Sequence, residues 1–203
     1  MKTTLYLGTD PTRFECEGHL IHYPIIKIIP RNSPEIELSL QKFDAFTHVI
    51  FTSRNAASVF FQHKKDLSSK IVIAIGAATA QLLRCNGVEP RFVSEEETQE
   101  GVVKLLETLD LSDAYFFMPR SSLSRPVLAQ YFTEKGVRFE ACELYDTVTQ
   151  DLTFKPDLEL VDEIVFTSPS TVKAFIEIFK ELPKAKKLLA IGPVTKAALE
   201  KLD

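Results

Sequence analysis

The chain contains the same two-part phrase twice, and this repeat constrains its fold more than any other feature. The sequence FTSRNAASVFF begins at Phe51, and FTSPSTVKAFI begins at Phe166, 115 residues later. A second pair keeps the same order, because AIGAATAQLL begins at Ala74 and AIGPVTKAAL begins at Ala190, 116 residues later. Since both the order and the spacing are kept, we interpret the repeat as a duplicated structural unit.

Within each copy, short apolar runs alternate with amphipathic stretches. The runs are rich in β-branched and aromatic residues, which indicates strands, and the stretches have apolar residues at helical spacing. Strands that alternate with helices are typical of parallel α/β layers, and continuous apolar runs such as IVIAI suggest sheets covered on both faces. The expected strands are 4–8, 24–29, 48–53, 70–76, 90–93, 115–119, 139–148, 163–168 and 187–192, and the expected helices include 55–63, 78–86, 98–109, 123–135 and 170–181.

In each copy two strands run directly into polar turns that begin helices. The first turn reads Thr-Ser-x-(Asn/Ser) and the second reads Ile-Gly-x-x-Thr. The simplest interpretation is that these residues only cap duplicated helices, since Ser, Thr and Asn are preferred N-caps. However, helix N-termini and strand ends share one edge of a parallel sheet, where free N–H groups suit carboxylates or phosphates. Four such turns, two in each of two lobes across a cleft, would hold a polyanion.

The composition argues against several other classes of protein. The 203 residues carry a net charge of −4, so we expect neither nucleic acid nor a membrane surface as a partner. No GxGxxG follows the first strand and no GxxxxGK(S/T) is present, which argues against a dinucleotide or P-loop site. Cys16, Cys85 and Cys142 are far apart and form no CxxC pair, so we interpret them as reduced, buried cysteines of a cytoplasmic protein.

The sequence does not indicate a metal site. His19 and His22 have i,i+3 spacing but no third ligand nearby, and we interpret them as ordinary residues at the start of a strand. The acidic run SEEETQEG at 94–101 has capping-box spacing between Ser94 and Glu97. We therefore expect a solvated helix start there rather than a cation site, and no metal or organic cofactor.

Taken in order, the repeated phrases and their neighbours resemble uroporphyrinogen-III synthase. The matching segments span roughly residues 46–200 and read FTSRNAASVF, IAIGAATAQLLRCNGVEP, RSSLSRPVLAQYFTEKGVRFEACELYDT, FTSPSTVKAFIEIF and AIGPVTKAAL. The resemblance implies an α/β fold with two doubly wound, flavodoxin-like parallel-sheet lobes joined by two extended linkers, near 28–33 and 143–149. On that pattern residues 1–32 and 149–203 form a discontinuous first lobe, and residues 33–148 form the second.

The resemblance also implies an activity. The family closes hydroxymethylbilane, a linear tetrapyrrole polycarboxylate, into uroporphyrinogen III, with loss of water and inversion of ring D through a spiro intermediate. Such an enzyme would need no cofactor, and we expect it to be a monomer. Positioning would be its main contribution, because the unflipped ring closes without control, and a general acid would assist the leaving hydroxyl.

The resemblance assigns candidate site residues by position. Tyr145 in LYDT matches the family's most plausible acid, because a phenol with a reference pKa of about 10 keeps its proton at neutral pH. The other interpretation of Tyr145 is a packed tyrosine at the end of a strand. The substrate-binding candidates come from the two kinds of turn and from an arginine of the R..L...L...G helix: Ser53, Gly76, Thr79, Arg125, Ser168, Ser170, Gly192 and Thr195.

The sequence departs from the family's pattern near both ends. The family's first strand ends in an arginine, whereas TLYLGTDPT offers Gly8 and Thr9, and FECEGHL replaces part of the next helix. After IGPVTKAALEKLD, internal symmetry predicts that one strand and one helix are absent, so the lobe containing 163–192 should have one strand fewer. Two alternatives stay open: a two-lobed module that binds a small polyanionic ligand without chemistry, and a degenerate synthase kept for heme regulation.

Overall fold

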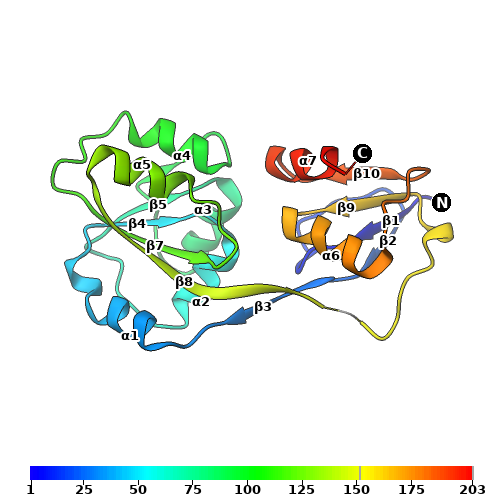
Figure 1. The fold of residues 1–203 in the computed structure, drawn as a ribbon, viewed down its shortest axis with the longest axis horizontal. Helices are drawn as coiled ribbons and strands as arrows, with labels where there is room; N and C mark the ends of the chain where they lie inside the picture. The colour runs from blue at the N-terminus through cyan, green and yellow to red at the C-terminus, as the bar shows by residue number, and fades with distance from the viewer. Residues whose placement is uncertain (151, 203) are drawn as a thin grey trace. The chain divides into compact units, whose positions relative to one another are not determined.

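Two compact units make up the computed structural model, which describes residues 1–150 and 152–202. Unit 1 contains Met1–Ile28 and Thr147–Asp203, and unit 2 is the continuous segment Ile29–Asp146. In Figure 1 the dark-blue and the orange-to-red segments belong to unit 1, and the cyan and green segments belong to unit 2. The boundaries of the units lie a few residues before the lobe boundaries expected from the sequence.

Unit 1 is built on a four-stranded parallel sheet. Its elements are β1 (Thr3–Tyr6), β2 (His19–His22), a 3₁₀ turn (Leu158–Leu160), β9 (Glu163–Phe166), α6 (Pro169–Phe179), β10 (Lys187–Ala190) and α7 (Pro193–Glu200). The strands lie in the order β10-β9-β1-β2, and every neighbouring pair is parallel. Leu5 and Ile164 are partners across β1 and β9, and both are fully buried in one core with Phe175 of α6.

The second sheet has six strands, and most of their residues belong to unit 2. Its strand order is β3-β8-β7-β4-β5-β6, and the pairs from β8 to β6 are parallel. The strands are β3 (Ile26–Pro30), β4 (His48–Phe51), β5 (Ile71–Ala74), β6 (Phe92–Val93), β7 (Tyr115–Ser121) and β8 (Arg138–Thr149). The helices are α1 (Pro34–Gln41), a 3₁₀ turn (Phe43–Ala45), α2 (Arg54–Phe61), α3 (Ala77–Cys85), α4 (Gln99–Leu106) and α5 (Val127–Lys135).

Helices cover both faces of this sheet. Successive residues of a strand point to opposite faces, and β7 places two adjacent phenylalanines in this way. Phe116 stacks on Phe132 of α5 with ring centres 4.5 Å apart, whereas Phe117 packs against Phe60 of α2 at 6.0 Å. All four rings are fully buried. The predicted doubly wound α/β architecture with parallel sheets is therefore confirmed.

The two segments that connect the units pair with each other. The Arg31 N–H donates to the Leu144 carbonyl at 2.8 Å, and the Gln150 N–H donates to the Ile25 carbonyl at 2.7 Å. Since the residue numbers run in opposite directions, β3 and β8 are antiparallel. Because β3 is added to the second sheet, the two sheets differ by two strands among the described residues. The predicted difference of one strand is therefore wrong.

Two described elements were not expected. The residues of β2 were interpreted only as the start of a strand. In the structure all four of them pair with β1 in parallel, from Thr3 with His19 to Tyr6 with His22. α1 lies just after the expected linker, and its start has ordinary signals. The Ser33 hydroxyl accepts from the Ile36 N–H at 3.4 Å, Pro34 is in the first turn, and Glu35 follows it. These residues would have predicted the helix.

The helix after the acidic run begins at Gln99, one residue after the expected start at 98, but its cap differs from the expected one. The N-cap of α4 is Thr98, whose hydroxyl accepts from the Gly101 N–H at 3.0 Å. Ser94 instead donates its hydroxyl to the Glu96 carbonyl at 2.7 Å. The predicted capping box between Ser94 and Glu97 is therefore wrong, and the Glu97 carboxylate has another partner.

The cysteines differ in exposure, although all three were expected to be buried. Cys142 is buried, Cys16 is partly exposed and Cys85 is exposed, and all three are free thiols. Burial raises the pKa of the Cys142 thiol to about 11, so it stays protonated at neutral pH.

A buried carboxylate ties together the strand starts of unit 1. The Glu163 side chain is 4% exposed, and it accepts from the Thr4 hydroxyl at 2.8 Å and pairs with Lys2 at 2.8 Å. Burial by itself raises the pKa of this carboxyl, but the bonds from Lys2 and Thr4 hold the pKa below its ordinary value. These residues lie at the starts of β1 and β9, away from the helix N-termini, so we interpret the cluster as structural.

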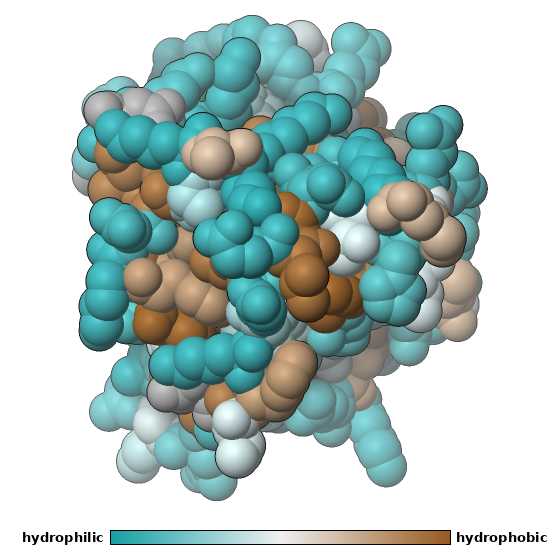
Figure 2. Space-filling view, turned by 90° about the vertical axis from the view of Figure 1, so that its right-hand side faces the viewer, coloured by the Kyte–Doolittle hydropathy of each residue, from teal (hydrophilic) through white to brown (hydrophobic). Residues whose placement is uncertain are grey.

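The face drawn in Figure 2 is mostly hydrophilic, with smaller apolar patches among the polar side chains. The exposed apolar residues include Phe154 and Leu160, which are 73% and 72% exposed. Within residues 1–150 and 152–202, no helix combines the length and the apolar character that crossing a membrane requires.

Candidate active site

The order of the strands brings the Tyr145 phenol to the first turn of unit 2. Tyr145 lies on β8, next to β7, and Ser53 directly follows β4, which is the next strand along. Their hydroxyl oxygens are 3.0 Å apart although 92 residues separate them in the sequence. The Tyr145 side chain is only 4% exposed. Burial raises the pKa of Tyr145, and the bond to Ser53 only partly opposes this shift, so the phenol keeps its proton at neutral pH.

Ser53 also begins a helix. Its hydroxyl oxygen accepts from the Ala56 N–H at 3.0 Å and so caps α2. The same oxygen is the one bonded to Tyr145. Because a serine hydroxyl has one proton and two acceptor positions, it can serve both partners at once. The phenol is therefore attached to a helix N-terminus, where the unpaired N–H groups favour negative charge.

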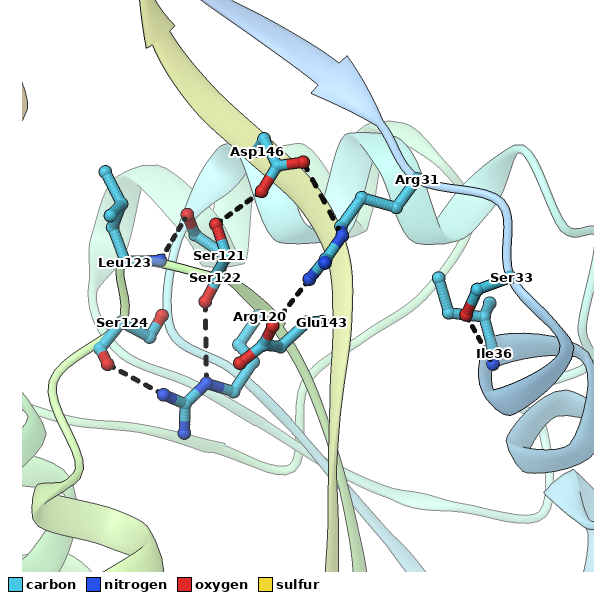
Figure 3. Close-up of polar contacts among 10 residues, drawn as sticks. All are labelled: Arg31, Ser33, Ile36, Arg120, Ser121, Ser122, Leu123, Ser124, Glu143 and Asp146. Carbon is cyan, nitrogen blue, oxygen red and sulfur yellow. Dashed lines mark hydrogen bonds and ion pairs between the residues drawn. The ribbon is translucent and has the colours of Figure 1, made fainter.

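A network of polar and charged groups lies along β8 near Tyr145, and Figure 3 draws Arg31, Glu143 and Asp146 of this network. The Ser122 N–H donates to the Tyr145 carbonyl at 3.1 Å, and the Ser122 hydroxyl donates to Asp146 at 2.5 Å. Arg31 pairs with Glu143 at 2.5 Å and with Asp146 at 3.5 Å. These contacts hold the residues on both sides of Tyr145, and they join the turn after β7 to β8.

A second arginine lies at the end of β7. The Arg120 guanidinium donates to the Ser124 carbonyl at 2.7 Å and to the Ser121 carbonyl at 3.5 Å, as Figure 3 shows. Arg120 is only partly exposed. It borders a cavity of about 10 Å³, the size of one water molecule, whose lining consists of Thr52, Gln99, Met118, Arg120, Ser124, Arg125 and Leu128. Sequence reasoning missed Arg120, although its place before the polar run Ser121–Ser124 was a usable signal.

The second turn of unit 2 is already in contact with a carboxylate. Gly76 caps α3 without a side chain, and the next N–H, that of Ala77, donates to Glu97 at 2.8 Å. A Cβ added to Gly76 would lie 2.4 Å from the Glu97 side chain, so the glycine allows this approach. Thr79 is 3% exposed on the first turn of α3.

Arg125 likewise has an acidic partner. It lies just before α5, and its two terminal nitrogens contact the two Glu100 oxygens at 2.5 and 2.7 Å. This two-pronged pair lowers the pKa of Glu100 to about 2. Such planar pairing is the strongest common geometry between arginine and a carboxylate.

The corresponding turns of unit 1 follow β9 and β10. Ser168 caps α6 in a reciprocal capping box with Thr171, and the Ser168 and Ser170 hydroxyls are 2.8 Å apart. Gly192 caps α7 with φ 83° and ψ 158°, which is a backbone region that only glycine adopts readily. Thr195 is 3% exposed on the first turn of α7.

The structure thus groups the predicted residues within each unit. In unit 2, Tyr145 contacts Ser53, and the parallel strands β4 and β5 place the Gly76 turn beside the Ser53 turn. In unit 1, the parallel strands β9 and β10 place the Ser168 and Gly192 turns side by side in the same way. Sequence reasoning missed Arg31, Asp146 and Arg120. Near the atypical first strand, Gly8 lies so close to Thr167 that a Cβ would approach it to 2.7 Å.

The described residues contain no group of three or more His, Cys, Asp or Glu side chains that could hold a metal ion. The fold and the turns define an α/β protein of two parallel-sheet units whose strands end at helix N-termini suited to anions. The model of the protein family described as "Uroporphyrinogen-III synthase HemD" matches residues 15–203 of this chain. The chain therefore belongs to this family. The recognition made from the repeated phrases is therefore confirmed. The family consists of enzymes of heme and tetrapyrrole biosynthesis.

Individual relatives agree with the family. A protein of Methanothermobacter thermautotrophicus is 28% identical over 203 aligned residues, covering 90% of this chain and 80% of the relative. The uroporphyrinogen-III synthase of Chlorobaculum parvum is 27% identical over 173 residues, covering 77% and 70%. The crystal structure of uroporphyrinogen-III synthetase from Helicobacter pylori matches the fold with a TM-score of 0.70 at 19% identity, covering 99% of this chain and 89% of that one.

Proposed function

We propose that this protein cyclises hydroxymethylbilane to uroporphyrinogen III, with loss of water and inversion of ring D. Membership of the family supports synthase activity. The observation that carries the residue-level proposal is the 3.0 Å contact between Tyr145, within β8, and Ser53, in the turn after β4. It combines a protonated phenol with a helix N-terminus, as a proton donor beside a bound carboxylate would require.

Tyr145 is the proposed proton donor to the departing hydroxyl. The carbon–oxygen bond of the hydroxymethyl group breaks, its electron pair leaves with the oxygen, and a proton converts hydroxide into water. The hydroxymethyl carbon then bonds to the substituted α-carbon of ring D and gives a spiro intermediate. The bond from that α-carbon to the methylene shared with ring C breaks, the methylene bonds to the free α-carbon of ring D, and this carbon releases a proton. One carbon–oxygen bond is replaced by one additional carbon–carbon bond and water leaves, so the reaction balances without an oxidant. A phenol whose pKa is raised by burial is protonated before this step and can donate.

The turns are the proposed carboxylate sites. The protein carries a net charge of −4, so a polyanionic substrate is not attracted by overall charge. Local donors must bind it instead, and the N-termini of α2, α3, α6 and α7 supply neutral N–H groups. By fixing more than one carboxylate, the neighbouring turns of a unit would restrict the conformation of the substrate and so favour closure with ring D inverted.

The test is incubation with freshly prepared hydroxymethylbilane, followed by oxidation and separation of the porphyrin isomers. We expect the type III isomer to form faster than the uncatalysed type I isomer. If only type I forms, the protein is not a synthase. Saturable binding of hydroxymethylbilane without type III product would instead support the binding module that the sequence left open.

A further inference from the structure

One short acidic segment occupies two of the positions that we assign to the substrate. The Glu97 carboxylate accepts from the Ala77 N–H at the start of α3 at 2.8 Å. Three residues later, the Glu100 carboxylate pairs with both terminal nitrogens of Arg125, at 2.5 and 2.7 Å. The two carboxylates come from separate residues and meet separate partners, but both belong to the run at 95–100, here called the acidic turn.

The backbone around the acidic turn is shaped to allow these contacts. Gly76 leaves room for the Glu97 side chain, and a Cβ there would lie 2.4 Å from it. Gly101 does the same for the turn itself, since a Cβ would lie 2.2 Å from the Glu96 carbonyl. Between the two carboxylates, Thr98 fixes the start of α4. The acidic turn is thus held in place by contacts that do not depend on either carboxylate.

Both contacts are accessible to an external competitor. Glu97 is exposed, and the side chains of Arg125 and Glu100 are 38% and 49% exposed. Exposed ion pairs contribute little net stability because water competes for both partners. A second carboxylate can therefore replace Glu100 on Arg125 with the same two-pronged geometry. At the start of α3, a carboxylate from a ligand would accept the same N–H that Glu97 now accepts.

We infer that Glu97 and Glu100 are intramolecular competitors of the substrate carboxylates, so that the acidic turn sets the affinity of the enzyme for its substrate. This inference rests on the proposed function of the same turns. Binding then requires exchange of one carboxylate for another at Ala77 and at Arg125. In the free enzyme, Glu97 and Glu100 therefore occupy the Ala77 N–H and the Arg125 guanidinium. Because substrate and product must both displace these carboxylates, both bind more weakly than they would without them.

The test compares two double variants. The test variant combines Glu97→Gln and Glu100→Gln, and the matched control combines Glu95→Gln and Glu96→Gln. Each pair removes two negative charges from the acidic turn, but the control leaves the Ala77 and Arg125 contacts intact. We expect the KM for hydroxymethylbilane to fall about threefold to tenfold in the test variant, with kcat changed less than about twofold. We expect the control to change KM by less than about twofold, because Glu95 and Glu96 are exposed and the ion pair of Glu96 with Lys104 lies outside the Ala77 and Arg125 contacts.

A second readout does not need turnover. Citrate, a simple tricarboxylate, is titrated into ¹⁵N-labelled protein while the Ala77 amide and the Arg125 side-chain signals are followed. We expect the test variant to respond at several-fold lower citrate concentration than the wild type and the control. If the wild type makes no type III product, the proposed function fails, but this titration still decides whether the carboxylates compete.

Three results would overturn the inference. One is an unchanged or higher KM together with a wild-type citrate response in a test variant that melts normally. The other is a fall in melting temperature with neither KM nor the citrate response improved, which would assign both contacts to folding alone. Equal improvement in the test and control variants would also overturn it, because overall charge would then explain the effect.

Discussion

The Tyr145 hydroxyl has one described polar side-chain partner, the Ser53 hydroxyl at 3.0 Å, and little contact with water. Replacing Tyr145 by Phe keeps the ring and removes only this hydroxyl. General-acid assistance is typically worth about 10²–10⁴ in rate, so we expect turnover to fall at least about a hundredfold. Since the turns set the conformation of the substrate, the product that forms should remain type III. Initial rates and isomer ratios measure both effects.

Thr79→Val is the comparison for Tyr145→Phe. Thr79 is also buried, at 3% exposure, and Val keeps its shape while removing a hydroxyl. Loss of one hydroxyl among many backbone donors should cost about tenfold or less in turnover. Melting temperatures of both variants serve as the folding control. Near-normal turnover of a folded Tyr145→Phe enzyme would show that the phenol is structural and that another group donates the proton.

At the scale of single residues, the sequence suggested candidate side chains but did not predict which partners they contact. Tyr145 and Ser53 were both assigned by resemblance, but their contact joins residues 92 positions apart and no local pattern indicates it. Arg125 was assigned to the substrate, whereas its partner in the structure is Glu100. Pairings of this kind depend on strand order, which spacing along the chain does not encode.

At the scale of elements, the two repeated glycines are conformationally different. Gly192 has φ 83° and ψ 158°, with open space where a Cβ would point. Gly76 has φ 178°, which is ordinary extended backbone, but a Cβ would meet Glu97. One glycine is therefore required by its backbone and the other by its neighbour, although the sequence around both reads Ala-Ile-Gly.

We predict different costs for the two alanine variants. Gly192→Ala should lower the free energy of unfolding by about 1–3 kcal/mol, because the backbone must adopt a region that only glycine favours. Gly76→Ala should cost less, about 1 kcal/mol or below, because the flexible Glu97 side chain can move away. Urea unfolding followed by circular dichroism measures both. Equal costs, or a larger cost at Gly76, would contradict this assignment.

Long apolar strands and strongly amphipathic helices were predictable, whereas short or contact-dependent elements were not. The paired phrases predicted β4, β5, β9 and β10 and the helices that follow them, because each is a buried strand that runs into a capped helix. β2 has only four residues, HLIH, and its polar ends hide the strand pattern. The start of α4 was predicted within one residue, but its cap was misassigned because Ser94 and Glu97 have the spacing of a capping box, while Glu97 contacts the start of α3, 20 residues away.

At the scale of the whole molecule, the repeat predicted duplication but not the sharing of strands. Each copy of the repeat contributes its strands to one sheet, and each sheet has its own buried apolar residues; in the second sheet these lie on both faces. β3 and β8 belong to neither copy of the repeat, so comparing the two copies could not predict how many strands they add. Their pairing adds β3 to the second sheet, which would otherwise have five strands against the four of the first sheet.

Separate cores lead to the last prediction. Phe175 is fully buried in the core of unit 1, and Phe132 is fully buried in a core of unit 2. We expect Phe175→Leu to reduce hydrogen-exchange protection in β1, β9 and α6 by about 1 kcal/mol, while β4, β5 and α5 stay protected. Phe132→Leu should do the reverse, because each substitution loosens only the helices and strands that its ring contacts. Native-state exchange followed by mass spectrometry of peptides resolves the two units in one experiment. If either variant weakens both sets of strands equally, the two cores unfold as one cooperative unit, and the division of the chain into two units has no thermodynamic counterpart.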